Sequence, residues 1–494
     1  MKLNQLYKSI PDKWIRLFLF YTFSFVFVLL NAWLVLKKDT LLGVLIPVVF
    51  AILLMAVFSY KSLIWIAVFF TPLSIPLEKL YYGLPFDMAL PTEPLLFGIL
   101  ILFLFSLSQG NRIDRQITTH PVALVIYFYL GWIAFTSVTS TLPLVSVKYL
   151  LVRIWYILIF FFLLAYLFKN QKKIEQFIWI FTLAFVPVIL YTIIRHLQLG
   201  LHDNNAAHWV MDPFFNDHTS YGAVLAMFIP FLIGFSFAKW IKLPHRIWLW
   251  ALLFIFVVAE ILSFSRAAWL SLIVSFGVWI IIKLKIKFKT LAITTLTLLF
   301  IVFAFQQQIL LKLEQNSTDS SNNLMDHVSS MTNITTDASN LERINRWQCA
   351  IAMFIEKPVF GWGPGTYAMK YAPYQLSSQR TIISTNSGDG GNAHSEYLGA
   401  LAETGLMGML SFILLIIVVM YTAIRAYTRA NDKRIKTLIL SSLISLITYY
   451  IHSFLNNFLD TDKAAVPFWG FTAIIVALDI YTHEQQKKEV VSKV

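Results

Sequence analysis

The sequence predicts an all-α, polytopic integral membrane protein with about 12 to 14 transmembrane helices and one large loop that contains short helices. The chain has 494 residues, of which 58% are hydrophobic and 13% charged, and its mean hydropathy is +0.69. Apolar windows of about 18 to 25 residues, the length that crosses about 30 Å of hydrocarbon as a helix, recur along nearly the whole chain. No alternating pattern of a β-barrel appears, so helices are the expected spanning elements.

Fourteen apolar stretches are candidate spans. They cover residues 16–36, 41–59, 62–76, 91–109, 119–139, 147–168, 174–199, 219–238, 245–263, 266–283, 289–307, 396–424, 438–456 and 465–482. Pro72, Pro76, Pro91 and Pro94 interrupt the early stretches, so one of these can be re-entrant or interfacial, and twelve spans is the lower figure. The first stretch is too long for a signal-peptide core and has no small-residue cleavage site, so we expect it to be retained.

The distribution of basic residues predicts the orientation in the membrane. The net charge of +13 would suggest a nucleic-acid partner in a soluble protein, but 25 of the 39 basic residues here lie in the connections on one side of the predicted spans. Residues 308–395 hold only six. The positive-inside bias therefore places both termini in the cytoplasm and this long segment in the periplasm, and no nucleic-acid partner is expected.

Three parts follow from this pattern. We expect an N-terminal helix bundle over 1–307, a large periplasmic loop over 308–395, and C-terminal transmembrane helices over 396–494. In the loop, residues 315–340 are polar and almost free of aromatic residues, whereas 341–375 carry apolar residues at helical spacing before a proline and a glycine-rich turn. The second half predicts a helix on the membrane face followed by a tight loop.

Arginines near the predicted outer face are the first candidate site residues. Arg266, in "LSFSRAAWLS", opens a span and can be an interfacial anchor, although two serines and Glu260 nearby make the turn polar. Arg343 and Arg346, in "LERINRW", are three residues apart and share a helix face, where Glu342 can pair with them. Guanidinium groups can bind phosphate through two parallel hydrogen bonds.

A histidine precedes the C-terminal spans in "NAHSEYLGALAETGLMG". His394 can act as a general base near neutral pH, or it can be a solvated loop residue. Glu396 and Glu403 can orient it, or they can cap the helix that begins at Ser395. The competing outward histidine is His218, in "FNDHTSYGAVL". The single cysteine excludes an intramolecular disulfide and a cysteine metal cluster.

Three motifs together resemble the O-antigen ligase and O-antigen polymerase superfamily of bacterial inner-membrane glycosyltransferases. They are "SFSRAAWLS", "ERINRWQCAIAMFIEKPVFGWGPGTY" and "HSEYLGALAETGLMG", and they cover about residues 260–410. Arg266, Arg343 and His394 fall on the family's two arginines and its histidine, with Arg346 as the close rival of Arg343. Many relatives have asparagine after the histidine, where this chain has Ser395, so no role of that amide carries over.

The resemblance implies transfer of a glycan from an undecaprenyl diphosphate donor to an acceptor hydroxyl at the periplasmic face of the inner membrane. No nucleotide site is visible, and an outward-facing enzyme has no sugar nucleotides to use, so the donor must bring its own leaving group. Arginines would bind the diphosphate while His394 takes the acceptor proton, without a metal or another cofactor. Arg153, Arg195, Glu396 and His218 are further candidates for substrate binding.

Several functions remain open at this point. Within the superfamily we favour a ligase that acts on lipid A core, because a single large outward loop leaves no second one for another lipid-linked chain. The alternatives are an O-antigen or exopolysaccharide polymerase and a protein O-oligosaccharyltransferase. A lipid or glycan transporter is the main alternative from another class, since Arg153, Arg195 and Glu260 lie within predicted spans. A structural scaffold is the weakest.

Overall fold

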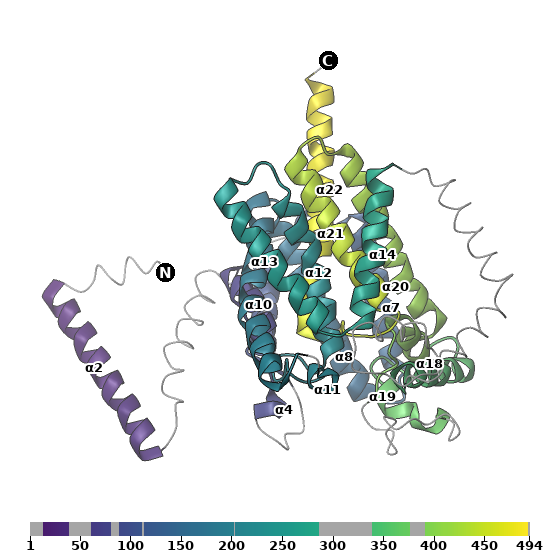
Figure 1. Ribbon diagram of the computed structural model, residues 1–494, viewed down its shortest axis with the longest axis horizontal. Coiled ribbons are helices and arrows are strands. Elements are labelled where there is room, and N and C mark those ends of the chain that lie inside the picture. Colours follow the sequence, from purple (N-terminus) through teal and green to yellow (C-terminus); the bar gives the residue numbers. More distant parts are fainter. Residues whose placement is uncertain are drawn as a thin grey trace. The chain divides into compact units, whose positions relative to one another are not determined.

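The computed structural model describes residues 13–38, 61–80, 88–110, 113–201, 203–285, 338–375 and 391–492. The chain divides into two units, Met1–Ile64 and Trp65–Val494. The main described element of the first unit is α2 (Lys13–Lys38). The second unit contains the helix bundle and every candidate site residue (Figure 1).

Helices dominate the second unit from its start to its end. Its elements are η1 (Thr71–Leu73), β1 (Ile75–Pro76), α4 (Leu77–Leu80), β2 (Ala89–Leu90), α5 (Thr92–Ser108), α6 (Arg115–Thr118), α7 (Pro121–Val138), α8 (Pro143–Ile157), the π-helical η2 (Leu158–Leu163), α9 (Leu164–Leu167), α10 (Gln171–Leu199), α11 (Asn204–Ala207), α12 (His218–Ser236), α13 (Leu243–Leu262), α14 (Arg266–Lys283), α18 (Ala338–Glu356), α19 (Tyr367–Lys370), η3 (Ala372–Tyr374), α20 (Glu396–Arg429), α21 (Lys433–His452) and α22 (Asp462–Val491). The short strands β1 and β2 pair antiparallel, with Ile75 opposite Leu90.

The prediction of an all-α polytopic membrane protein is confirmed. Nine helices in the described ranges are long and apolar enough to cross a membrane, and three shorter apolar helices coincide with the predicted spans at 16–36, 62–76 and 91–109. The predicted spans at 41–59 and 289–307 lie outside the described residues. The exact number of spans therefore stays a prediction.

Polar caps and prolines explain where the spans begin. Asn170, Asp217, Ser395 and Asp432 each accept a hydrogen bond from a backbone N–H in the first turn of the helix that follows, which satisfies a donor that the helix itself cannot. α7, α8 and α13 instead carry proline in their first two positions, where the missing N–H costs nothing. These local signals set the helix ends around the site.

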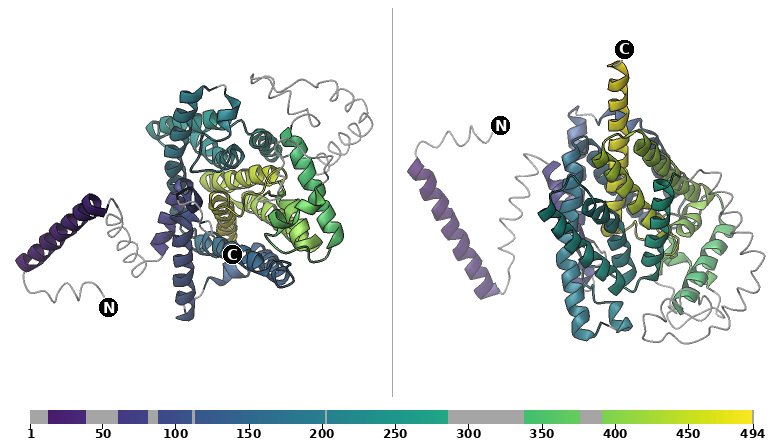
Figure 2. Two further views of the ribbon diagram at one scale, coloured as in Figure 1. Left: turned by 90° about the horizontal axis from the view of Figure 1, so that it is seen from below. Right: turned by 45° about the horizontal axis from the view of Figure 1, so that its top comes forward.

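The helices α21 and α22 form the centre of the bundle. Their apolar windows are 83% and 89% buried, whereas those of α13 and α14 are 28% and 22% buried. Figure 2 shows α21 and α22 surrounded by the other helices. The outer helices therefore present their apolar side chains to lipid, and the central pair carries the protein core.

The candidate site lies at one end of this bundle. There, the backbone N–H of Glu396 at the start of α20 donates to Ser453 O just after α21, at 2.9 Å. The start of α12 packs against the start of α14, since a side chain at Gly222 would bring its Cβ to 2.9 Å from that of Ser265. We call this region the site end. α18 lies across it, away from the end at which α22 terminates (Figure 1).

A small apolar cluster fixes α18 to the start of α20. Its buried members are Cys349, Ala350, Met353, Tyr367, Tyr371, Ala393 and Ala402, with Trp362, Tyr374 and Leu398 packed against them. Gly405, at φ 70°, interrupts α20 and lies so close to the segment after α18 that an added Cβ would sit 2.2 Å from Val359 O. This packing holds the arginines of α18 in a defined position over the histidine segment.

Candidate functional site

The backbone around His394 is held from three directions. His394 has a φ of 47°, which is uncommon outside glycine, and its N–H donates to Asn392 Oδ1 at 3.1 Å. Trp347 Nε1 of α18 donates to His394 O at 3.2 Å. The side chain of Ser395 caps α20 by accepting from Leu398 N. These contacts fix the backbone that carries the half-buried imidazole.

The two arginines of α18 have different surroundings. Arg343 donates through Nε to Leu455 O in the α21–α22 connection at 3.3 Å. Arg346 is 4% exposed, donates to Glu342 Oε1 at 2.7 Å, and lies 3.9 Å from the ring centroid of Tyr371. Gly391 passes so close that a Cβ would overlap the Arg346 guanidinium. Of the two, Arg346 is more completely enclosed by protein groups.

Two arginines and two further histidines lie close enough to His218 for their charges to act on it. The rings of His208 and His218 are 4.1 Å apart, and the charges of Arg343, Arg266 and His452 act on His218. The charge of Arg343 also acts on the imidazoles of His452 and His394. We call Arg266, Arg343, His208, His218 and His452 the arginine–histidine cluster. It brings together residues from α12, α14, α18 and α21, which lie far apart in the sequence.

The environment of His394 keeps its imidazole neutral at physiological pH. Burial is the main cause, and the charges of Arg343 and Arg346 add to it, so that the pKa of His394 falls to about 4. Glu342 and Asp217 oppose this shift. A neutral imidazole can accept a proton, so His394 is in the form that a general base requires.

A cavity of about 670 Å³ opens on the other side of the histidine segment. It is lined by residues of α8, α12 and α20, the segments before α12 and α20, and the connection between α21 and α22. Its carboxylates are Glu93, Asp217, Glu396, Glu403, Asp460 and Asp462, and its basic side chains are Lys148, Arg153 and Lys463. The wall therefore carries a formal excess of three negative charges.

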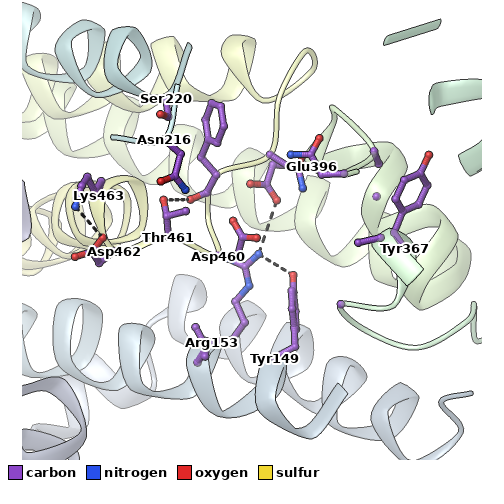
Figure 3. A pocket seen from close by; sticks show the side chains of 18 of the residues that line it. Tyr149, Arg153, Asn216, Ser220, Tyr367, Glu396, Asp460, Thr461, Asp462 and Lys463 are labelled. Carbon is purple, nitrogen blue, oxygen red and sulfur yellow. Dashed lines mark hydrogen bonds and ion pairs between the residues drawn. The ribbon is translucent and has the colours of Figure 1, made fainter. Parts of the chain in front are cut away.

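Arg153 of α8 lies at the centre of this wall (Figure 3). It is 2% exposed and donates to Leu459 O at 2.6 Å and to the Tyr149 hydroxyl at 2.7 Å. Glu396 Oε2 is 3.8 Å from Arg153 Nη2, and Glu396 Oε1 accepts from Leu459 N and the Tyr449 hydroxyl. Arg153 and Glu396 thus join α8, α20, α21 and the α21–α22 connection around the cavity.

Glu403 holds the glycine-rich turn. Its carboxylate accepts from Gly365 N and Tyr367 N, both at 2.9 Å, while its carbonyl accepts from Gly363 N at 2.8 Å. Within the described ranges, no hydrogen bond joins Glu403 or Glu396 to His394. The two carboxylates contact other backbone groups instead, and the orientation of His394 comes from its own segment and Trp347.

Arg195 is not among the residues that line the cavity. It donates to Asp212 O at 2.7 Å, and its guanidinium carbon is 4.7 Å from the Trp209 ring centroid. These contacts join α10 to the segment that leads into α12. The proposed role of Arg195 in substrate binding stays a prediction.

The sequence did not single out three groups at this end. His208 and His452 complete the arginine–histidine cluster, and Asp460 faces the cavity. The available signal was the polar run "NNFLDTDK" between the last two spans, on the same predicted side as His394. In the described part of the chain, no group of three or more His, Cys, Asp or Glu side chains is placed to hold a metal ion.

The fold and the site define a polytopic α-helical membrane protein with cationic side chains gathered beside a neutral histidine at one end of its bundle. Residues 251–413 match the family model of the O-antigen ligase domain, so this part of the chain is similar to the O-antigen ligase and polymerase superfamily. The matched range includes Arg266, Arg343, Arg346 and His394. A search of curated proteins gave no match.

Proposed function

We propose that this protein transfers a glycan from undecaprenyl diphosphate to an acceptor hydroxyl at the periplasmic face of the bacterial inner membrane. The observation that carries the proposal is that the charges of Arg343 and Arg346 act on His394, while Arg343 and Arg266, from separate helices, both act on His218. The match of residues 251–413 to the O-antigen ligase domain supports the reaction class. Side-chain cations beside a neutral base suit a lipid diphosphate leaving group.

The proposed step is a displacement at the anomeric carbon. The acceptor oxygen forms a bond to that carbon as the bond to the diphosphate oxygen breaks. His394 takes the acceptor proton and becomes imidazolium, while Arg266 and Arg343 stabilise the charge that develops on the departing diphosphate. Arg346 supports Arg343 from the same helix, and His218 and His452 position the cluster.

We favour an O-antigen ligase that uses lipid A core as the acceptor, because the chain offers one large outward loop. A deletion strain distinguishes the possibilities through its surface glycolipids. Free lipid A core together with accumulated lipid-linked polymer indicates a ligase, and core capped by single repeats indicates a polymerase. Normal glycolipids with loss of protein glycosylation would indicate transfer to protein. Lipid-linked glycan retained on the cytoplasmic leaflet would indicate a transporter.

Orientation gives the next prediction. Lys169, Lys239, Arg425, Arg429 and Arg434 lie around the end of the bundle opposite the site, where the positive-inside bias favours the cytoplasm. In a Cys349→Ala background, Gln348→Cys on α18 should be labelled by an impermeant thiol reagent from the periplasm, and Asn431→Cys should not. Both parent side chains are exposed, so accessibility is matched. Labelling of Asn431→Cys alone would show that the orientation in the membrane is the opposite of the one proposed.

The pH dependence tests the environment of His394. Because the pKa of His394 is lowered to about 4 rather than the usual 6.5, its imidazole stays neutral as the pH falls from 7 to about 5. We expect kcat/KM to stay level over this range and to fall with a midpoint near 4. Bound diphosphate neutralises the charge of the nearby arginines, which raises the pKa of His394. The fall in kcat should therefore occur at a higher pH than the fall in kcat/KM. A midpoint near 6.5 in kcat/KM would contradict a buried base.

A further inference from the structure

The cavity and the arginine–histidine cluster share a wall made of two short segments. In the first, Asn216, Asp217 and Ser220 line the cavity, whereas His218 contacts His208 in the cluster. In the second segment, Asn392, Ala393 and Ser395 line the cavity, whereas His394 is close enough to Arg343 for the charge of that arginine to act on it. His394 therefore stands between a cationic side and an acidic side.

The acidic side suits a ligand that donates hydrogen bonds. Ionised carboxylates only accept hydrogen bonds, and the wall of the cavity carries six carboxyl groups against three basic side chains. A diphosphate would meet like charge there, whereas the hydroxyls of a sugar would meet acceptors. Aromatic rings of Tyr129, Tyr149, Phe215, Tyr367 and Phe412 supply apolar surface between the carboxylates. A few polar groups on a largely aromatic wall are typical of small-ligand sites.

Asp460 is the carboxylate of this wall with hydrogen-bonding capacity left over. Glu396 and Glu403 already accept from backbone N–H groups, and Asp462 accepts from Ser74 at 2.5 Å. Asp460 is exposed to the cavity, and in the described part of the chain no other residue donates a hydrogen bond to its carboxylate. Figure 3 shows it beside Arg153 and Glu396.

The protein around the cavity shifts the pKa of Asp460. Although Asp460 is exposed to the cavity, desolvation by the surrounding protein raises its pKa, and the neighbouring Arg153 guanidinium opposes that rise. Arg153 itself is anchored to Leu459 O, one residue before Asp460. The backbone beside Asp460 is thus anchored in the wall of the cavity.

We propose that this cavity is the acceptor subsite, that it takes an uncharged sugar or an amino sugar of a glycan, and that Asp460 accepts hydrogen bonds from the hydroxyls of that sugar. The inference rests on the proposed function and adds to it the side from which the acceptor reaches His394. The donor diphosphate lies on the arginine side and the acceptor on the acidic side, with the imidazole between them.

The test is two-substrate kinetics on the full-length protein in lipid nanodiscs. The donor is an undecaprenyl-diphosphate-linked glycan, and the probe acceptor is the oligosaccharide released from lipid A core. Asp460→Asn keeps the size of the side chain but removes its charge and one acceptor oxygen. We expect the acceptor KM to rise about 10-fold to 100-fold, the usual effect of losing a hydrogen bond to a charged group, with the donor KM changed less than about twofold.

Two further variants make the result specific. Asp460→Glu keeps a carboxylate and should restore part of the acceptor affinity. Asp203→Asn is the same substitution at the same end of the bundle but outside the cavity, and it keeps an N-cap oxygen for α11, so both KM values should stay unchanged. A titration of tryptophan fluorescence with the oligosaccharide alone should show weaker binding to Asp460→Asn, because Trp155 lines the cavity.

The possible outcomes separate this inference from the function beneath it. Transfer by the wild-type protein with an unchanged acceptor KM in Asp460→Asn would overturn the subsite but leave the transferase intact. A rise confined to the donor KM would make the cavity a site for the donor glycan and would also overturn it. If the wild-type protein transfers no glycan from this donor, the proposed function fails and the subsite fails with it.

Discussion

Replacing His394 with alanine should lower the turnover number by about a hundredfold to ten-thousandfold, the usual range for loss of a general base. Binding of the lipid-linked donor should change little, because the arginines that we propose to bind the diphosphate remain. The fold should be retained, since the structural contacts at this position are made by backbone atoms: its N–H donates to Asn392 and its carbonyl accepts from Trp347. Single-turnover kinetics with saturating donor measures the loss directly.

The control for this variant is His483→Ala, which removes an exposed histidine from the part of α22 farthest from the site. It should leave turnover unchanged. His218→Ala should give an intermediate loss, because His218 belongs to the cluster around Arg266 and Arg343. Near wild-type turnover in His394→Ala together with a severe loss in His218→Ala would indicate that His218, and not His394, is the general base.

Changing Arg266 or Arg343 to lysine should reduce kcat/KM by about a hundredfold in each case. Lysine keeps the positive charge but loses the planar pair of donors that can bind two phosphate oxygens at once, and loss of one preorganised donor to developing charge commonly has an effect of this size. The measurement is kcat/KM for the donor at fixed acceptor. Arg434→Lys, at the opposite end of the bundle beside Glu175, is the matched control and should have little effect.

Full activity in both lysine variants would show that Arg266 and Arg343 act only as membrane anchors. Arg346 is not a suitable substitute for either of them in this test. Its guanidinium is buried between Glu342 and Tyr371, so a change there alters the packing of α18 as well as any contact with substrate.

Hydropathy and local signals predicted the fold well. Each span carries apolar side chains that face lipid, and capping residues such as Asp217 and Ser395 mark the starts of helices in the sequence. The helix over the second half of the outward loop was predicted for the same reason, since the apolar residues of α18 recur at helical spacing. The motifs also predicted which arginines and which histidine to examine.

The partners of these residues were not predictable, because they come from distant parts of the chain. His452 ends α21 and meets Arg343 of α18 only in the folded bundle, and Asp460 meets Arg153 across more than three hundred residues. Arg195 also has a partner that its place within a predicted span did not reveal, since it donates to the carbonyl of Asp212, and its role in substrate binding stays a prediction. Charge within a span indicates a polar partner without saying which one.

The most direct test of the account is reconstitution of the purified protein in nanodiscs with undecaprenyl-diphosphate-linked glycan and lipid A core. Release of undecaprenyl diphosphate is measured together with the glycan on the acceptor. We predict that the wild-type protein forms both products in equal amounts, and that His394→Ala and Arg343→Lys lose both in parallel. An unmodified acceptor with intact donor in the wild-type reaction, or transfer that persists in His394→Ala, would contradict the account.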